Sequence, residues 1–309
     1  MSLCFQTFNY ASNVKSCVNK HTSHSQGKKN PSLLNLPSSI IRQGEKNDED
    51  PNRDFKFPLS SKSSGIGIIG GVSVDSSLNF AKKLVNFEDD ENSPPTFVLC
   101  SDPSLSKELL SLERSGKDNI RFDHGSIVEK IRRKRTFLEK SGVCCLVMPC
   151  DLLHYLYDEI EQGCCVPILH VGECVAKELK KAKLRPIEAG NPIRIGVLGT
   201  NENFVARFYQ EKLENEGFEV ILPDKATVEH TVIPAVEALS RKDIEGAQNL
   251  FRIGLQVLLV RAVNRVILAS DDLRQLLPPN DPLWTKCIDP MEALARSTIE
   301  FAQSVGRGK

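Results

Sequence analysis

The chain has 309 residues, with 40 Lys plus Arg against 40 Asp plus Glu, so its formal net charge is zero. Without an excess of positive charge, binding to nucleic acid or to an anionic membrane surface through bulk charge is not expected. Hydrophobic residues make up 40% and charged residues 26%, and no uncharged apolar run approaches the roughly 20 residues that span a bilayer. We therefore expect a soluble, core-forming protein with no nucleic-acid and no membrane partner.

The first 44 residues contain no Asp or Glu and many Ser. This composition is typical of a transit peptide, and several Lys with a single Arg favour a chloroplast (plastid stroma) address over a mitochondrial one. A disordered tail is the alternative. An acidic stretch at 45–50 and a Ser-rich stretch at 60–64 follow. We assign residues 1–62 to this transit or disordered segment and begin the folded part near Gly65.

Beyond Gly65, short apolar runs rich in Val and Ile alternate with longer stretches of helical periodicity. This alternation predicts parallel sheets with crossover helices. The expected strands are 66–69, 96–100, 143–148, 167–170, 194–198, 219–222 and 265–269. The expected helices are 75–86, 125–140, 153–162, 172–182, 201–216, 228–240, 243–263 and 290–304.

A polar break at 185–192, with two prolines and a glycine, divides these elements into two comparable sets. The predicted fold is therefore α/β, with two pseudo-symmetric lobes. Each lobe is a short parallel sheet flanked by helices, and the active-site cleft lies between them. We place the N-terminal lobe at 65–184 plus 290–309 and the C-terminal lobe at 185–289.

Three glycines near the first strand, Gly65, Gly67 and Gly70, have the spacing G-x-G-x-x-G of a dinucleotide fingerprint. In that fingerprint the glycines follow a strand, whereas here they are interleaved with it. The acidic cluster at 88–91 also precedes the second strand instead of ending it. A Gly-rich strand and turn is the better interpretation.

Cys150 follows an apolar strand and precedes a helix by two or three residues. Ligands of parallel α/β folds bind at the carboxyl ends of strands, and a helix N-terminus lowers the pKa of a nearby thiol. His154 follows one helical turn later, where it could share the proton of Cys150. An ordinary cysteine in a strand-to-helix turn is the alternative.

The stretch 147–154 resembles the Met-Pro-Cys-Asn-Thr-x-His signature of the aspartate/glutamate racemase family, which also includes hydantoin racemases. Further short motifs agree with the family in order and spacing, namely 65–71, 157–160 with 166–168, 196–200, 266–273 and 288–290. The similarity extends from Gly65 to Phe301. We interpret the chain as a plant-type member with an N-terminal extension.

The resemblance implies proton transfer at Cα of an amino-acid-like substrate by two thiols on opposite faces, without pyridoxal phosphate, other cofactor or metal. Cys150 matches the first thiol. The second position is Ser270, whose hydroxyl is much harder to deprotonate. The activity is therefore expected to be weak or altered.

The resemblance also points to substrate-binding positions at Asp151, Thr200 and Asp271. Asp151 and Asp271 replace the family's Asn and Thr, so two added carboxylates would repel an acidic amino acid. A basic residue on the substrate side is not evident, since the stretch 101–108 offers only Lys107.

The ten cysteines predict mostly reduced thiols, because the chain is long and opens with no signal-peptide core. Adjacent pairs at 144–145 and 164–165 lack the spacing of a metal site, so no metal is expected.

Three functions remain open. The first is a racemase or epimerase that uses Cys150 and Ser270. The second is a related isomerase or hydantoin-type enzyme that needs only Cys150. The third is a non-catalytic relative that binds a ligand. We further expect a homodimer.

Overall fold

The computed structural model describes residues 65–87, 94–114, 124–200, 202–278 and 280–307. All described residues belong to the unit 54–309. The transit peptide predicted at 1–62 lies outside the described residues. The lobe boundaries at 184/185 and 289/290 stay predictions.

Two parallel sheets of four strands each form the framework, as predicted. The first has the order β2-β1-β3-β4 and the second the order β6-β5-β7-β8, so the two orders are equivalent. The strands are β1 (Ile66–Ile69), β2 (Phe97–Cys100), β3 (Cys145–Val147), β4 (Ile168–Leu169), β5 (Arg194–Leu198), β6 (Glu219–Ile221), β7 (Arg265–Leu268) and β8 (Cys287–Ile288). All seven predicted strands are present. Only β8 was not predicted.

The helices are α1 (Val74–Val85), α2 (Pro103–Arg114), α3 (Gly125–Lys140), α4 (Asp151–Tyr155), α5 (Tyr157–Glu161), α6 (Val171–Lys181), α7 (Glu202–Glu214), α8 (Lys225–Thr227), the π-helical turn η2 (Val228–Val232), α9 (Ile233–Ser240), α10 (Ile244–Leu259), α11 (Asp271–Arg274), the 3-10 turn η3 (Pro282–Lys286) and α12 (Pro290–Arg307).

Several helical features differ from the prediction. The helix predicted at 228–240 consists of the π-helical turn η2 followed by α9, and neither α8 nor η3 was predicted. The helix predicted at 153–162 is two short helices, α4 and α5, which meet at Leu156. The short helix α11 was not predicted. Nor was α2, although its start signals are in the sequence: Pro103 is its first residue, and the carboxylate of Asp102 accepts a hydrogen bond from the backbone of Ser104 at 2.9 Å.

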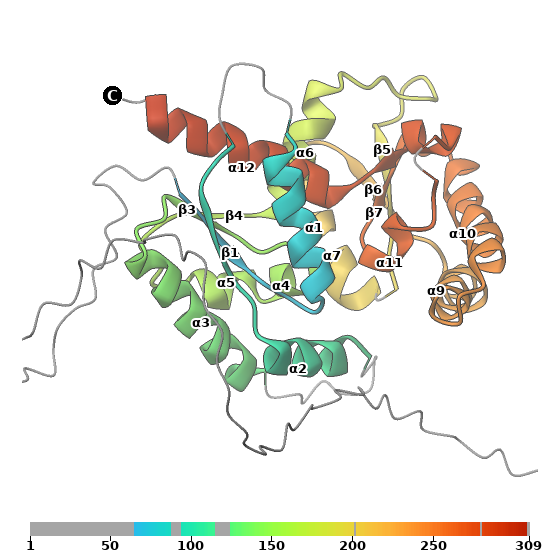
Figure 1. Cartoon of the computed structure of the whole chain (residues 1–309). Coiled ribbons are helices and arrows are strands. Elements are labelled where there is room, and N and C mark those ends of the chain that lie inside the picture. Colours follow the sequence, from blue (N-terminus) through green and yellow to red (C-terminus); the bar gives the residue numbers. More distant parts are fainter. Residues whose placement is uncertain (1–64, 88–93, 115–123, 201, 279, 308–309) are drawn as a thin grey trace, which may run out of the picture. The chain divides into compact units, whose positions relative to one another are not determined.

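Helices α1, α6, α7 and α12 share one buried apolar cluster with residues from both sheets (Figure 1). A second cluster packs α2, α3 and α4 against the first sheet. A third packs α9 and α10 against the second sheet. The shared central cluster brings the carboxyl ends of β3 and β7 into one protein core, although their sequences lie about 120 residues apart.

Gly67 lies inside β1 and is fully buried. A Cβ atom there would come within 2.5 Å of the side chain of Leu146 on β3, so the glycine serves close packing between strand and core. This placement agrees with a Gly-rich strand and not with a phosphate-binding turn after one.

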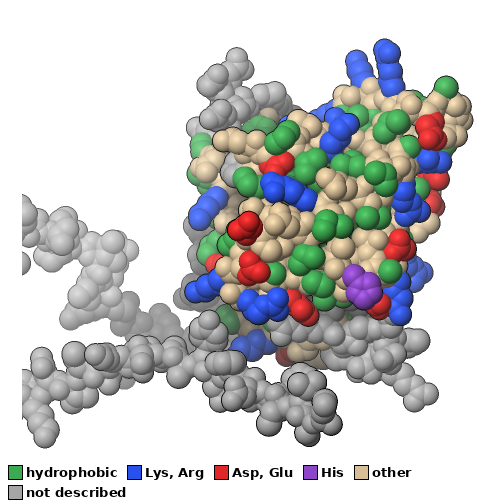
Figure 2. Space-filling model, turned by 90° about the vertical axis from the view of Figure 1, so that its right-hand side faces the viewer, with side chains coloured by type: hydrophobic (Ala, Val, Ile, Leu, Met, Phe, Trp, Pro, Cys, Tyr) green, Lys and Arg blue, Asp and Glu red, His purple; other side chains and the backbone are tan. Residues whose placement is uncertain are grey.

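Charges of both signs are interspersed with apolar side chains on the face drawn in Figure 2. Within the described ranges, no helix is both long and apolar enough to cross a membrane.

Candidate active site

Cys150 and Ser270 occupy equivalent positions in the two halves of the fold. Cys150 follows β3 and precedes α4, while Ser270 follows β7 and precedes α11. Their backbones are alike, with φ of −158° and −157°, and each residue is 8% exposed. Because β3 and β7 hold the same place in their sheets, the two side chains stand at matching strand ends.

The turn that follows β1 packs directly on Cys150. A Cβ atom at Gly71 would overlap the Cβ of Cys150 and come within 2.5 Å of its Sγ. Any side chain at this position would displace the thiol, so only glycine allows the backbone to approach it. In the second sheet, Gly199 after β5 approaches the carbonyl of Ala269, the residue before Ser270.

The sequence suggested that His154 shares the proton of Cys150, but the ring of His154 contacts the backbone instead. Its Nε2 lies 3.0 Å from the carbonyl oxygen of Met148, which also accepts from the backbone N–H of Cys150 at 2.7 Å. Burial lowers the pKa of His154 to about 4, so the ring is neutral and donates through Nε2. His154 therefore fixes the turn on which Cys150 stands.

Both carboxylate oxygens of Asp151 have protein partners from the other half of the fold. The hydroxyl of Tyr209, on α7, donates to Oδ1 at 2.8 Å. The guanidinium of Arg274, on α11, lies 3.3 Å from Oδ2. Burial, reinforced by Asp151, raises the pKa of Tyr209, so the phenol stays protonated and remains a donor.

Asp271 contacts the same arginine. Nη2 of Arg274 pairs with Oδ1 of Asp271, and the hydroxyl of Ser76, on α1, donates to Oδ2. Arg274 is only 9% exposed, so its charge is poorly screened by water. The two carboxylates that the sequence placed at the ligand thus share one buried cation.

A third carboxylate, that of Asp289, lies 3.5 Å from Nε of Arg274. Its other oxygen pairs with Lys83 at 3.1 Å. Asp289 also caps α12, since its Oδ1 accepts from the backbone N–H of Met291 at 2.9 Å. Arg274 and Lys83 therefore balance three aspartates incompletely, and this group keeps a negative charge.

Thr200 follows β5 and is half-buried, at the strand end equivalent to the Gly70 turn. Because β5 pairs in parallel with β7, Thr200 lies at the same edge of the second sheet as Ser270.

Sequence reasoning missed Arg274, Tyr209 and Ser76. Arg274 could have been found from the sequence, because it lies three residues after Asp271 and residues at that spacing are neighbours on a helix. Tyr209 and Ser76 come from helices remote in sequence and carry no signal of their own.

The eight cysteines within the described ranges are thiols. Burial raises the pKa of Cys174 to about 11 and that of Cys287 to about 12, so both are protonated at neutral pH. No group of three or more His, Cys, Asp or Glu residues in the described ranges is placed to hold a metal ion.

Residues 69–298 match the family model described as Asp/Glu/Hydantoin racemase. The broad specificity amino-acid racemase RacX of Bacillus subtilis is 27% identical over 167 residues, which cover 52% of this chain and 64% of RacX. The chain thus spans less than two thirds of that relative. An uncharacterized protein of Pectobacterium carotovorum is 25% identical over 146 residues, covering 47% of this chain and 91% of its own length.

Solved structures share the fold. An aspartate racemase homologue from Pyrococcus horikoshii superimposes with a TM-score of 0.63 at 21% identity, over 78% of this chain and 99% of its own. The aspartate racemase of Picrophilus torridus gives a TM-score of 0.58 at 22% identity, over 77% and 94% of the two chains. Both agree with the two equivalent four-stranded sheets.

Proposed function

Because the chain belongs to the Asp/Glu/hydantoin racemase family, we propose that it transfers a proton at Cα of an amino acid or a related 2-substituted acid without a cofactor. Cys150 is the base on one face of the substrate, and Ser270 occupies the opposite face. The match with an amino-acid racemase, RacX, supports this reaction class.

The observation that carries the proposal is the equivalence of Cys150 and Ser270. Two side chains at matching strand ends of two equivalent sheets can address one Cα from opposite sides. Inversion needs that arrangement, because the proton leaves one face and returns to the other.

The proposed reaction begins with Cys150 as a thiolate. Its Sγ takes the Cα proton, and the electron pair passes into the substrate carboxylate as an enediolate. Reprotonation from the other face takes the hydroxyl proton of Ser270, and the resulting alkoxide recovers a proton from water. The hydroxide so formed takes the proton of the Cys150 thiol, which restores the thiolate. This last half is slow, because a serine hydroxyl is a far weaker acid than a thiol.

Charge in the site bears on the substrate class. Arg274 is shared among Asp151, Asp271 and Asp289, so it is not a free partner for a second substrate carboxylate. A neutral or cationic amino-acid side chain fits this negative group better than that of free aspartate or glutamate.

Deuterium incorporation at Cα from heavy water tests the proposal, because it registers proton abstraction even when inversion is incomplete. A panel of neutral, basic and acidic amino acids is assayed as both enantiomers. We expect exchange with neutral or basic members that is absent in Cys150→Ala, and rapid exchange on L-aspartate would contradict the substrate class. If no amino acid in the panel exchanges, the racemase proposal fails.

A second candidate is an enzyme that uses only one thiol, a related isomerase or hydantoin-type enzyme, and Ser270 is the observation that favours it. Exchange confined to one enantiomer, with no product of the other hand, would assign the chain to this group. For a third candidate, a non-catalytic ligand-binding relative, a thermal-shift screen with the same panel would show binding without exchange.

Plastid localisation and a homodimer also remain proposals. The acid-free, Ser-rich composition of residues 1–44 supports import. A fluorescent reporter fused to residues 1–62 should enter plastids, and a cytosolic signal would refute the address. Sedimentation of the full chain measures its oligomeric state.

A further inference from the structure

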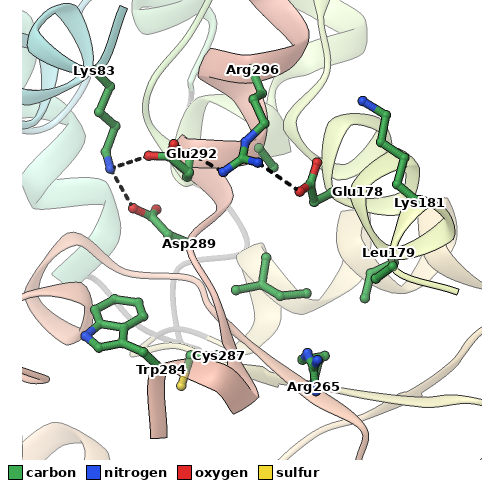
Figure 3. A pocket seen from close by; sticks show the side chains of 13 residues that line it. Lys83, Glu178, Leu179, Lys181, Arg265, Trp284, Cys287, Asp289, Glu292 and Arg296 are labelled. Atoms are coloured by element: carbon green, nitrogen blue, oxygen red, sulfur yellow. Dashed lines mark hydrogen bonds and ion pairs between the residues drawn. The ribbon is translucent and has the colours of Figure 1, made fainter. Parts of the chain in front are cut away.

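A cavity lies along the edge strand β8 and is lined also by residues of α1, α6 and α12 (Figure 3). Its volume is about 570 Å³, within the range of small-molecule sites. Neither Cys150 nor Ser270 lines it. We call this cavity the β8 pocket.

One part of the β8 pocket is apolar. Leu179, Ile288 and the indole of Trp284 line it, together with two small residues, Ala182 and Ala293. The indole N–H of Trp284 donates to the carbonyl of Pro278 at 2.9 Å, which fixes the orientation of the ring. A compact apolar group can therefore be received by a preformed surface.

Charged side chains also line the pocket. They are Lys83, Lys181, Arg265 and Arg296, with the carboxylates of Glu178, Asp289 and Glu292. Lys83 and Lys181 are engaged in ion pairs of 2.5 to 3.1 Å.

The two arginines of the pocket differ. Arg296 pairs with Glu292 at 3.4 Å and with Glu178 at 3.5 Å. Arg265 forms no ion pair with any described residue, and its hydrogen bond goes to the carbonyl of Asn264 at 3.2 Å. An anionic ligand can therefore pair with Arg265 without displacing a carboxylate of the described residues.

We propose that the β8 pocket binds a small molecule that carries a carboxylate on a compact apolar group. The carboxylate accepts from Arg265, whose planar guanidinium group suits its geometry. The apolar group lies against Trp284, Leu179 and Ile288. The β8 pocket shares Lys83 and Asp289 with the charged group beside Arg274, but neither Cys150 nor Ser270 lines it.

Trp284 is the single tryptophan of the chain, so its fluorescence reports on the β8 pocket alone. The probe is cyclohexanecarboxylate, which does not absorb where tryptophan is excited, and the matched neutral probe is cyclohexanecarboxamide. We expect the carboxylate to change the emission of the full chain with saturation. The carboxamide should bind at least about tenfold more weakly than the carboxylate, because it cannot form charge-assisted hydrogen bonds.

Two variants of Arg265 locate the site. Arg265→Gln should weaken carboxylate binding by about tenfold, and Arg265→Lys, which loses the planar pair of donors, should also weaken it. Arg241→Gln, at an exposed arginine outside the pocket, and Cys150→Ala should leave it unchanged. Circular dichroism shows whether each variant is folded, and at least one arginine variant is needed in the folded state.

Three outcomes would overturn the proposal. The first is an absence of saturable response at millimolar cyclohexanecarboxylate. The second is equal affinity for acid and amide. The third is affinity that persists in both arginine variants or disappears in Cys150→Ala, because the ligand would then lie elsewhere.

Discussion

The guanidinium of Arg274 lies 3.3 Å from the carboxylate of Asp151, so a cation that follows Ser270 in one half of the fold meets the residue that follows Cys150 in the other. Both partners are buried, with side-chain exposures of 9% and 7%. The contact thus links the two strand ends at which the proposed acid and base stand. Loss of this contact should lower the free energy of unfolding and also alter the candidate active site.

Arg274→Gln should reduce the free energy of unfolding by about 3 to 5 kcal/mol, because it leaves the buried carboxylate of Asp151 without its cation. Chemical denaturation measures the change. The double variant with Asp151→Asn should lose less than Arg274→Gln alone, since the uncompensated charge is gone. Arg133→Gln, at an exposed pair with Glu129, should change stability by no more than about 0.5 kcal/mol. A double variant as unstable as the sum of the single variants would show that the two residues are not coupled.

Ser270→Cys should raise deuterium exchange on the enantiomer that the unmodified chain handles slowly, by about a hundredfold, because a thiol replaces a weak acid at the same strand end. On a neutral or basic substrate the carboxylates of Asp151 and Asp271 do not repel the side chain, so adding Asp151→Asn and Asp271→Thr is not expected to increase the gain. Ser270→Ala is the control and should abolish exchange on that enantiomer. If Ser270→Cys still exchanges one enantiomer only, residue 270 does not face the substrate.

Gly71→Ala should displace the thiol of Cys150, because the added methyl group overlaps its Cβ and Sγ. We expect a loss of about 1 to 3 kcal/mol in stability, as for overpacking, and a changed rate of alkylation at Cys150 by iodoacetamide. Mass spectrometry maps the label. Gly306→Ala, where the added methyl group meets nothing within 4 Å, is the matched control. Unchanged stability and labelling in Gly71→Ala would mean that the turn and the thiol are not in contact.

His154 should make the protein acid-sensitive. Burial lowers its pKa from 6.5 to about 4, so below pH 6.5 the unfolded chain binds a proton that the folded chain does not. The contribution of His154 to the free energy of unfolding is fully present above pH 6.5 and is lost as the pH falls toward 4. Between pH 7 and pH 5 the loss amounts to about 2 kcal/mol.

His154→Gln tests that contribution, since the amide can still donate to the carbonyl of Met148 but does not titrate. Denaturation at pH 7 and pH 5 should show a smaller decrease in stability for this variant than for the unmodified chain. His230→Gln, at an exposed position, should keep the full decrease. An equal decrease in all three proteins would assign the acid sensitivity to other groups.

The sequence determined the framework of this protein. Runs such as 66–69 and 194–198, which are rich in Val and Ile, are buried on both faces in parallel sheets, and that burial leaves a continuous apolar signal. The turn at Cys150 was also accessible, because a strand end and a helix start follow each other within three residues. Its counterpart at Ser270 depended on the family resemblance, since α11 is too short to show a helical period.

Only the tertiary structure decided how the site is charged. The contacts of Arg274 with Asp151, of Tyr209 with Asp151 and of Ser76 with Asp271 join elements that are 58 to 195 residues apart. Periodicity describes which face of a helix is buried, but not which helix packs against it. For that reason the sequence predicted two repelling carboxylates, whereas the packed halves supply the buried arginine that both of them share.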